Sequence, residues 1–178
     1  MYDTGEVIWM AIEQASYTVI TKEGPFEIRR YEKLIVAISA ESDLRGYSGF
    51  NEAFNYISGA NSQRKKIAMT SPVINDLSEE HFTTAFVMPK EYQIEDLPTP
   101  ASQRLNIKEI SERIVAAITF TGNISATKIE EKKIELLKWL SLKGYEEINS
   151  LELARYNPPF IPGFMKRNDL IIEIRESA

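Results

Sequence analysis

The sequence predicts an α+β fold in which two similar halves, each a strand–helix–strand–strand unit, build one barrel-like sheet. Each half has apolar strand runs on both sides of one amphipathic helix, and each helix is followed by a glycine. Corresponding residues of the two halves are separated by a nearly constant number of positions. Residues 33–37 correspond to 113–117, which is 80 positions later, Gly59 and Gly144 are 85 positions apart, and Pro72 and Pro158 are 86 positions apart. One unit alone would leave a sheet face uncovered and two edges open. Joining both units in one sheet, with the helices outside or across the mouth, solves both problems.

The composition is that of one globular domain, or of two small halves sharing a core. The chain has 178 residues, of which 43% are hydrophobic and 26% charged. Its formal net charge of −5 argues against nucleic acid as a partner, because phosphate binding needs a basic face. A chain without cysteine cannot hold a thiolate metal site or a disulfide, and its one histidine, His81, cannot build a multi-histidine site.

We divide the chain into an N-terminal extension, residues 1–16, and one domain, residues 17–176, with halves at about 17–96 and 101–176. The apolar run at 7–12 is far too short to span a membrane. Asp3 and Glu6 precede it where a signal peptide would carry Lys or Arg. We therefore expect a cytoplasmic protein with no transmembrane segment, whose N-terminal run packs on the body or lies at a surface.

The first half begins with a hairpin, because residues 17–22 and 26–31 are rich in β-formers and flank a Gly-Pro turn. A central strand follows at 33–40. A helix is predicted over 48–58, with Ser48 as its cap and with Phe50, Ala53, Phe54 and Ile57 on one face. Strands at 67–74 and 82–88 complete this half, and the proline-rich segment 97–100 is a linker.

The second half repeats this pattern with strands at 105–110 and 113–120. A capping box, Thr127 with Glu130, predicts the start of the second helix. The buried stripe of that helix consists of four aliphatic residues, Ile129, Leu136, Leu137 and Leu140. Strands at 151–156 and 169–175 end the domain.

A basic loop lies between the first helix and the next strand. Arg64, Lys65 and Lys66 are consecutive there, and the apolar strand containing Met69 follows. Aromatic residues at helical spacing and a strand methionine are more often core than ligand pocket, and three cations are most often a solvated loop. Together, however, they predict one wall of a ligand site.

The motifs in this region resemble those of the SOUL/HEBP haem-binding proteins. The resemblance rests on Tyr56-Ile-Ser-Gly-Ala-Asn61, Ile67-Ala-Met-Thr-Ser-Pro-Val73, the linker Leu97-Pro-Thr-Pro100, and Ala154-Arg-Tyr-Asn-Pro-Pro159 with Arg167-Asn168-Asp169. It implies a distorted antiparallel barrel of two βαββ-type halves flanked by two helices, and tetrapyrrole binding in a groove along the first helix. The same architecture is similar to that of bacterial effector-binding modules related to the gyrase-inhibitory protein, which take small ligands between their halves.

For a tetrapyrrole, the resemblance implies an apolar slot formed by Phe50, Phe54, Ile57 and Met69, and propionate contacts from the cations 64–66. The sequence has no histidine near the first helix, since His81 follows an acidic polar turn. An iron ligand, if there is one, could be Met69 or a phenolate from Tyr47 or Tyr56. The metal ligand therefore stays open.

The leading hypothesis is a non-enzymatic carrier or buffer for haem or a related tetrapyrrole. The alternative is a general small-molecule effector-binding module, or a hydrolase, that uses the groove between the two halves. A third possibility is a partner-binding protein that uses the apolar run at 7–12. Enzyme chemistry has little support, because the sequence has no Gly-x-Ser-x-Gly elbow and a catalytic triad would depend on His81.

Overall fold

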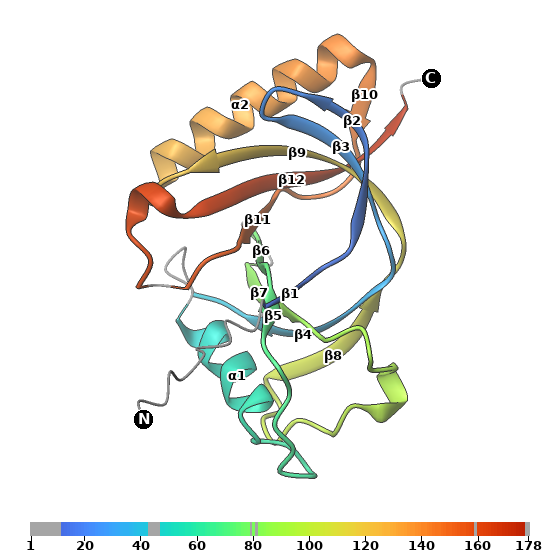
Figure 1. The fold of residues 1–178 in the computed structure, drawn as a ribbon, viewed down its shortest axis with the longest axis vertical. Helices are drawn as coiled ribbons and strands as arrows, with labels where there is room; N and C mark the ends of the chain where they lie inside the picture. The colour runs from blue at the N-terminus through green and yellow to red at the C-terminus, as the bar shows by residue number, and fades with distance from the viewer. Residues whose placement is uncertain (1–11, 43–46, 79, 81, 159, 177–178) are drawn as a thin grey trace, which may run out of the picture.

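The computed structural model describes residues 12–42, 47–78, 80, 82–158 and 160–176. Over these ranges the chain is an α+β fold with a curled antiparallel sheet and two helices, which confirms the predicted fold class (Figure 1). Neither α1 nor α2 has the length and apolarity that a membrane crossing requires. His81 and all of the run 7–12 except Ile12 lie outside the described residues, so their predicted roles stay predictions.

Two α-helices, two 3-10 helices and twelve strands are found in the described ranges. The helices are α1 (Ser48–Ile57) and α2 (Ala126–Lys143), and the 3-10 helices are Ile94–Asp96 and Gly163–Met165. The strands are β1 (Glu13–Gln14), β2 (Tyr17–Glu23), β3 (Phe26–Tyr31), β4 (Leu34–Ala40), β5 (Thr70–Ser71), β6 (Val73–Asp76), β7 (Thr83–Val87), β8 (Leu105–Ile110), β9 (Arg113–Thr121), β10 (Tyr145–Glu147), β11 (Glu152–Arg155) and β12 (Arg167–Glu176).

The order of strands in the sheet shows the internal repeat directly. The main sheet runs β2–β3–β9–β12–β11–β6–β7–β4–β8, and β10 pairs with β12. The first unit is β3–β4–α1–β6–β7, and the second, with the same order of elements, is β8–β9–α2–β11–β12. If each strand is replaced by the matching strand of the other unit, the order from β3 to β8 becomes the same order read backwards. The first strand of each unit pairs with the other unit, β3 with β9 and β8 with β4. The units are therefore interlocked, and the boundaries predicted for the halves stay a prediction.

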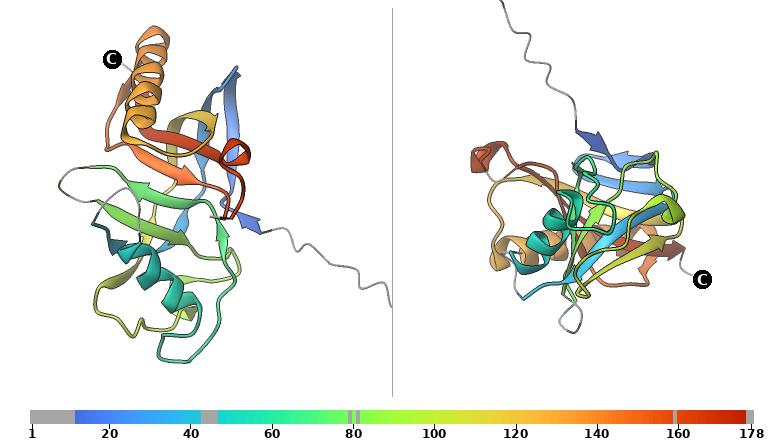
Figure 2. Two further views of the ribbon diagram at one scale, coloured as in Figure 1. Left: turned by 90° about the vertical axis from the view of Figure 1, so that its left-hand side faces the viewer. Right: turned by 90° about the horizontal axis from the view of Figure 1, so that it is seen from below.

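The second helix covers one face of the upper part of the sheet (Figures 1 and 2). Its buried face contains Ile129, Leu136, Trp139 and Leu140, and Leu137 is partly buried against the same cluster. The predicted capping box is wrong, because Ser125 is the N-cap residue and accepts a hydrogen bond from the Lys128 amide at 3.1 Å. The helix starts two residues earlier than a cap at Thr127 would allow. Gly144 ends it in the left-handed conformation, at φ 74°.

The first helix lies against the other part of the sheet, and its buried face is rotated from the predicted one. Gly49, Ala53, Tyr56 and Ile57 are buried, whereas Phe50 is half-buried and Phe54 is exposed. Gly49 brings the helix close to β4, because a Cβ atom there would stand 2.9 Å from the carbonyl oxygen of Ala40. The close approach explains why a residue without a side chain stands at this position of the buried face.

Two further predictions about the first half need correction. Ser48 is not the N-cap residue of α1, because it is the first residue inside the helix. Tyr47 occupies the N-cap position, and its side chain makes no capping hydrogen bond. The strand predicted at 67–74 is two short strands, β5 and β6, separated at Pro72 after a cis peptide bond. Proline has no N–H for a sheet ladder, so the pairing changes there: β5 pairs with β1, and β6 pairs with β7 and β11.

The space between the two sheet parts, on the faces turned away from the helices, is filled by an inner core. Both units contribute to it: Tyr31, Leu34, Val36, Ile74, Ala85, Val87, Val115, Ala117 and Ile171 are all buried there, together with Ala15. The cleft between the halves is therefore closed at its centre by packed side chains.

Candidate functional site

The surface of α1 carries an exposed aromatic ledge, which we define as Phe50 and Phe54. Their rings are stacked, with centroids 6.1 Å apart and planes at 10°. The rings of Phe50 and of Phe86 from β7 form a T-shaped pair with their centroids 5.0 Å apart, and this contact holds the inner end of the ledge. Phe54 is 46% exposed, so the ledge is open to a ligand from outside, whereas Ile57 lies below it in the core at 4% exposure.

A buried carboxylate, Glu41, holds the N-terminus of α1. Its Oε1 accepts hydrogen bonds from the amides of Ser42 and Ser48 and from the Ser48 hydroxyl. Its Oε2 accepts bonds from the amides of Gly49 and Phe50, at 2.9 and 3.2 Å. Sequence reasoning missed this residue, because a helix cap supplied from the end of the preceding strand leaves no local spacing signal.

The charge of Glu41 is strongly favoured by this setting. Burial opposes ionisation, but hydrogen bonds from the Ser48 hydroxyl, the Gly49 amide and the Thr84 hydroxyl lower the pKa of Glu41 from 4.5 to about 2. The first amides of α1, which have no partner within the helix, and the positive end of the helix dipole stabilise the same negative charge. Glu41 therefore fixes the end of α1 on which the aromatic ledge begins.

The C-terminal end of α1 is tied to the linker, which explains why the motifs occur together. Gly59 takes a positive φ of 117°. The Asn61 side chain donates to the carbonyl oxygens of Tyr56 and Lys65, at 2.9 and 2.8 Å, and accepts from the Lys65 amide at 3.0 Å. The phenol of Tyr56 donates to the carbonyl oxygen of Pro98 at 2.8 Å. The basic loop is thus held in one shape by Asn61 and by the proline-rich linker.

The three predicted cations have different surroundings. Lys65 lies over the ring of Tyr92, with its Nζ 4.5 Å from the ring centroid. Arg64, at a positive φ of 51°, and Lys66 are exposed. Met69 is 38% exposed and does not belong to the core cluster beneath α1. The structure therefore brings Phe50 and Phe54 together, and among the described residues none of the three cations makes a cation–π contact with that ledge.

The candidate iron ligands differ in accessibility. Tyr56 is 1% exposed, and its hydroxyl is used by Pro98. Burial, followed by repulsion from Tyr92, raises the pKa of Tyr56 to about 12, which does not suit a phenolate ligand. Tyr47 and Met69 are 68% and 38% exposed and stay available. No group of three or more His, Cys, Asp or Glu side chains placed to hold a metal occurs among the described residues.

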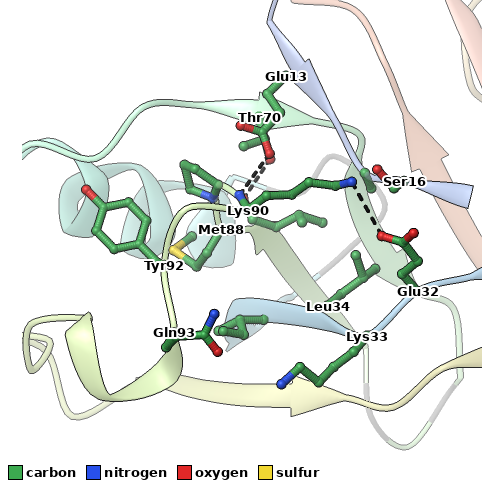
Figure 3. Close-up of a pocket in the computed structure, with 14 residues that line it drawn as sticks. Glu13, Ser16, Glu32, Lys33, Leu34, Thr70, Met88, Lys90, Tyr92 and Gln93 are labelled. Atoms are coloured by element: carbon green, nitrogen blue, oxygen red, sulfur yellow. Dashed lines mark hydrogen bonds and ion pairs between the residues drawn. The ribbon is translucent and has the colours of Figure 1, made fainter.

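A cavity of about 200 Å³ opens at the ends of β4 and β7 (Figure 3). Lys90 crosses it, with its Nζ 3.4 Å from the Glu32 carboxylate and its amide 2.8 Å from the carboxylate of Glu13. Tyr92, on which Lys65 stacks, lines the same cavity. Its volume is below the roughly 300–1,000 Å³ of ordinary ligand pockets, and α1 does not line it.

A second cavity, of about 340 Å³, lies under the β2–β3 hairpin. Beside it is a buried ionic network on the face of the sheet opposite α2. The guanidinium of Arg29, fully buried, donates to Glu27 at 2.7 Å and to Asp169 at 2.6 Å. Asp169 also accepts bonds from Thr119, Tyr156 and Arg167. Arg167 and Asp169 of the predicted motif thus belong to this network, whereas Asn168 donates to the carbonyl oxygen of Gly122; the motif starts β12.

The closeness of these charges shifts several pKa values. Burial alone would lower the pKa of Arg29, but the Asp169 carboxylate raises it well above its ordinary value. Burial opposes ionisation of Glu27, yet hydrogen bonds from Lys22 and Arg29 keep its pKa below the usual value. Burial raises the pKa of Tyr156, and the nearby Tyr31 and Asp169 raise it further. The pKa values of Glu27 and Arg29 are therefore moved in the directions that keep both side chains charged at neutral pH.

The curled sheet with two outer helices defines a fold of the effector-binding type. The structure is similar to that of the EcmrR C-terminal domain, with a TM-score of 0.64 and 11% identity, over 90% of this chain and 98% of that one. It is similarly related to a hydrolase from Listeria innocua, with a TM-score of 0.61 and 9% identity, over 88% of this chain and 94% of that one. At such low identity these likenesses concern the fold alone.

The sequence gives the narrower assignment. Residues 12–173 match the family described as SOUL heme-binding protein, and the chain belongs to that family. It is 32% identical to human Heme-binding protein 2 over 164 residues, covering 85% of this chain and 77% of the relative. It is 30% identical to mouse Heme-binding protein 2 over 150 residues, covering 77% of this chain and 72% of the relative.

Proposed function

We propose that this protein binds haem or a related tetrapyrrole and acts as a non-enzymatic carrier or buffer. The observation that carries the proposal is the exposed aromatic ledge on α1, in a chain whose family and curated relatives are described as heme-binding. A porphyrin is a flat apolar ring with two carboxylates, and it needs an aromatic surface and nearby donors.

In the proposed complex, the porphyrin face lies against Phe54 and Phe50. Ile57 supports the ledge from the core below it, and Met69 supplies a further apolar contact. Arg64, Lys65 and Lys66 meet the propionates from the loop that follows the helix, and Lys65 would leave Tyr92 to do so. Bound iron would supply the redox and ligand-exchange chemistry of the haem. Met69 and Tyr47 are the exposed side chains that could hold it.

A haemin titration of the purified protein, followed in the Soret band, tests the proposal. Phe54→Ala should weaken haemin binding by about fivefold to thirtyfold, because it removes an exposed ring contact of about 1–2 kcal/mol. Leu142→Ala is the matched control, since Leu142 is 77% exposed and lies on α2, away from the ledge. Phe54 is about half exposed and lies outside the core cluster beneath α1, so its variant should stay folded.

A second pair of variants tests the propionate contacts. Lys65→Gln should weaken haemin by about threefold to tenfold, and Lys108→Gln, at an exposed position on β8, should not. The absence of any Soret change at micromolar haemin would end the proposal. Equal haemin affinities for the native chain, Phe54→Ala and Lys65→Gln would remove the site on α1.

A further inference from the structure

The cavity under the β2–β3 hairpin has a built ionic wall on the inner face of the sheet. Tyr17, Lys22, Glu27, Thr119 and Arg167 all line it. These residues come from β2, β3, β9 and β12, and the register of those strands puts them on the face opposite α2. The cavity is therefore separate from the aromatic ledge, which lies on α1.

The acidic groups at this cavity are already satisfied by the protein itself. Glu27 accepts a hydrogen bond from Lys22 at 2.8 Å and another from Arg29 at 2.7 Å. Asp169, fully buried behind it, accepts bonds from both Arg29 and Arg167. A cationic ligand entering here would find each carboxylate compensated by an arginine, so the wall offers it no free acceptor charge.

The cationic groups, by contrast, are in excess and keep free donors. Three cations, Lys22, Arg29 and Arg167, face two carboxylates at this wall. Lys22 has a side chain that is 66% exposed and makes one ion pair through its Nζ. Arg167 uses its Nε and Nη2 for Asp169 and Tyr17, and within the described residues its Nη1 makes no bond.

An aromatic group stands next to these donors. The hydroxyl of Tyr17 accepts a bond from Arg167 at 3.2 Å, so its own proton can be donated to a ligand. The Arg29 guanidinium lies 4.4 Å from the centre of the Tyr17 ring, which holds the ring in place. A ligand with a flat apolar body could use the ring while its charged end meets the donors.

We propose that this cavity binds a small organic carboxylate. The carboxylate would accept hydrogen bonds from Lys22, Arg167 and the Tyr17 hydroxyl, and its apolar part would lie along the Tyr17 ring. A volume of about 340 Å³ lies at the lower end of the roughly 300–1,000 Å³ of ordinary ligand pockets. A molecule of the size of benzoate suits a cavity at this end of the range.

Three probes that share one ring but differ in charge test the proposal: benzoate, benzylamine and benzyl alcohol. Each is titrated into the protein labelled with 15N, and the amide shifts of Gly24 and Thr119, which line the cavity, are followed. Benzoate should bind at least tenfold more tightly than the other two probes. Lys22→Gln should weaken benzoate by about threefold to tenfold, and Arg167→Gln by more than about tenfold.

The controls separate binding from folding. Arg167 also contacts Asp169, so the benzoate affinity of Arg167→Gln is interpreted only if its thermal unfolding is unchanged. Lys22 is exposed, so Lys22→Gln tests the proposal whether or not the Arg167 variant is stable. Lys108→Gln should leave benzoate binding as it is. Benzylamine binding as tightly as benzoate, or a Lys22 variant with native affinity, would overturn the proposal. The haemin titration of Lys22→Gln should match that of the native chain, so the two proposals fail independently.

Discussion

Replacing Glu41 with glutamine should lower the free energy of unfolding by about 3 kcal/mol at neutral pH. The substitution keeps the size of the side chain but removes its charge and turns one of its oxygens into a donor. In the structure both carboxylate oxygens only accept, from four backbone amides and from the hydroxyls of Ser48 and Thr84. An amide NH₂ group in that position would face donors on all sides.

The magnitude follows from the pKa of Glu41. Lowering it from 4.5 to about 2 corresponds to about 3 kcal/mol, at about 1.4 kcal/mol for each pKa unit. Since the folded pKa lies below the unfolded one, this contribution is complete above pH 4.5 and is lost as the pH falls toward 2. The native chain should therefore lose about 1–1.5 kcal/mol of its advantage over the variant between pH 7 and about pH 3.5.

Urea unfolding of both proteins at a series of pH values measures this difference. All other carboxylates are shared, so their titration largely cancels when the two free energies are subtracted. Glu91→Gln, at an exposed position, is the matched control and should change the unfolding free energy by less than about 0.5 kcal/mol. A difference below about 1 kcal/mol at pH 7, or one that does not shrink on acidification, would refute the role given to Glu41.

Two further predictions concern packing on either side of the sheet. Tyr56→Phe should lower the free energy of unfolding by about 1–2 kcal/mol, because the buried carbonyl oxygen of Pro98 loses its hydrogen-bond donor. A melting temperature equal to that of the native chain would contradict this prediction. Leu136→Ala, at a fully buried position on the inner face of α2, should lower the free energy of unfolding measured by chemical denaturation by about 2–5 kcal/mol. It should leave haemin affinity unchanged in the folded protein, since α2 is not part of the proposed site.

Most of the fold could be predicted because its signals are local. The hairpin at 17–31, the strand β4, both helices and the proline-rich linker follow from periodicity, glycine stops and turn residues within a few positions of each other. The errors lie at the element ends. Thr127 with Glu130 looks like a capping box in isolation, and only the path of the chain shows that Ser125 begins the helix.

The polar groups that shape the two sites could not be predicted in the same way. Arg29 and Asp169 are 140 residues apart, and nothing in either neighbourhood marks them as partners. Glu41 acts on the amides of residues 48–50 from the end of the preceding strand, outside the spacing that capping rules describe. The spacing of apolar residues predicts Ala53 and Ile57 on the buried face of α1, but it does not predict Gly49, whose lack of a side chain allows the close contact with β4.

The inner core decides between the two ligand sites that the fold could offer. An open groove between the halves would need the inward-facing side chains of β4, β7, β9 and β12 to stand apart. Here Val36, Val87, Ala117 and Ile171 belong to one buried cluster, and separating them would expose apolar area at about 25 cal/mol for each Å². A ligand as large as a porphyrin is therefore excluded from the centre of this cleft. We therefore propose the outer surface of α1 for the tetrapyrrole and the rim under the hairpin for a small anion.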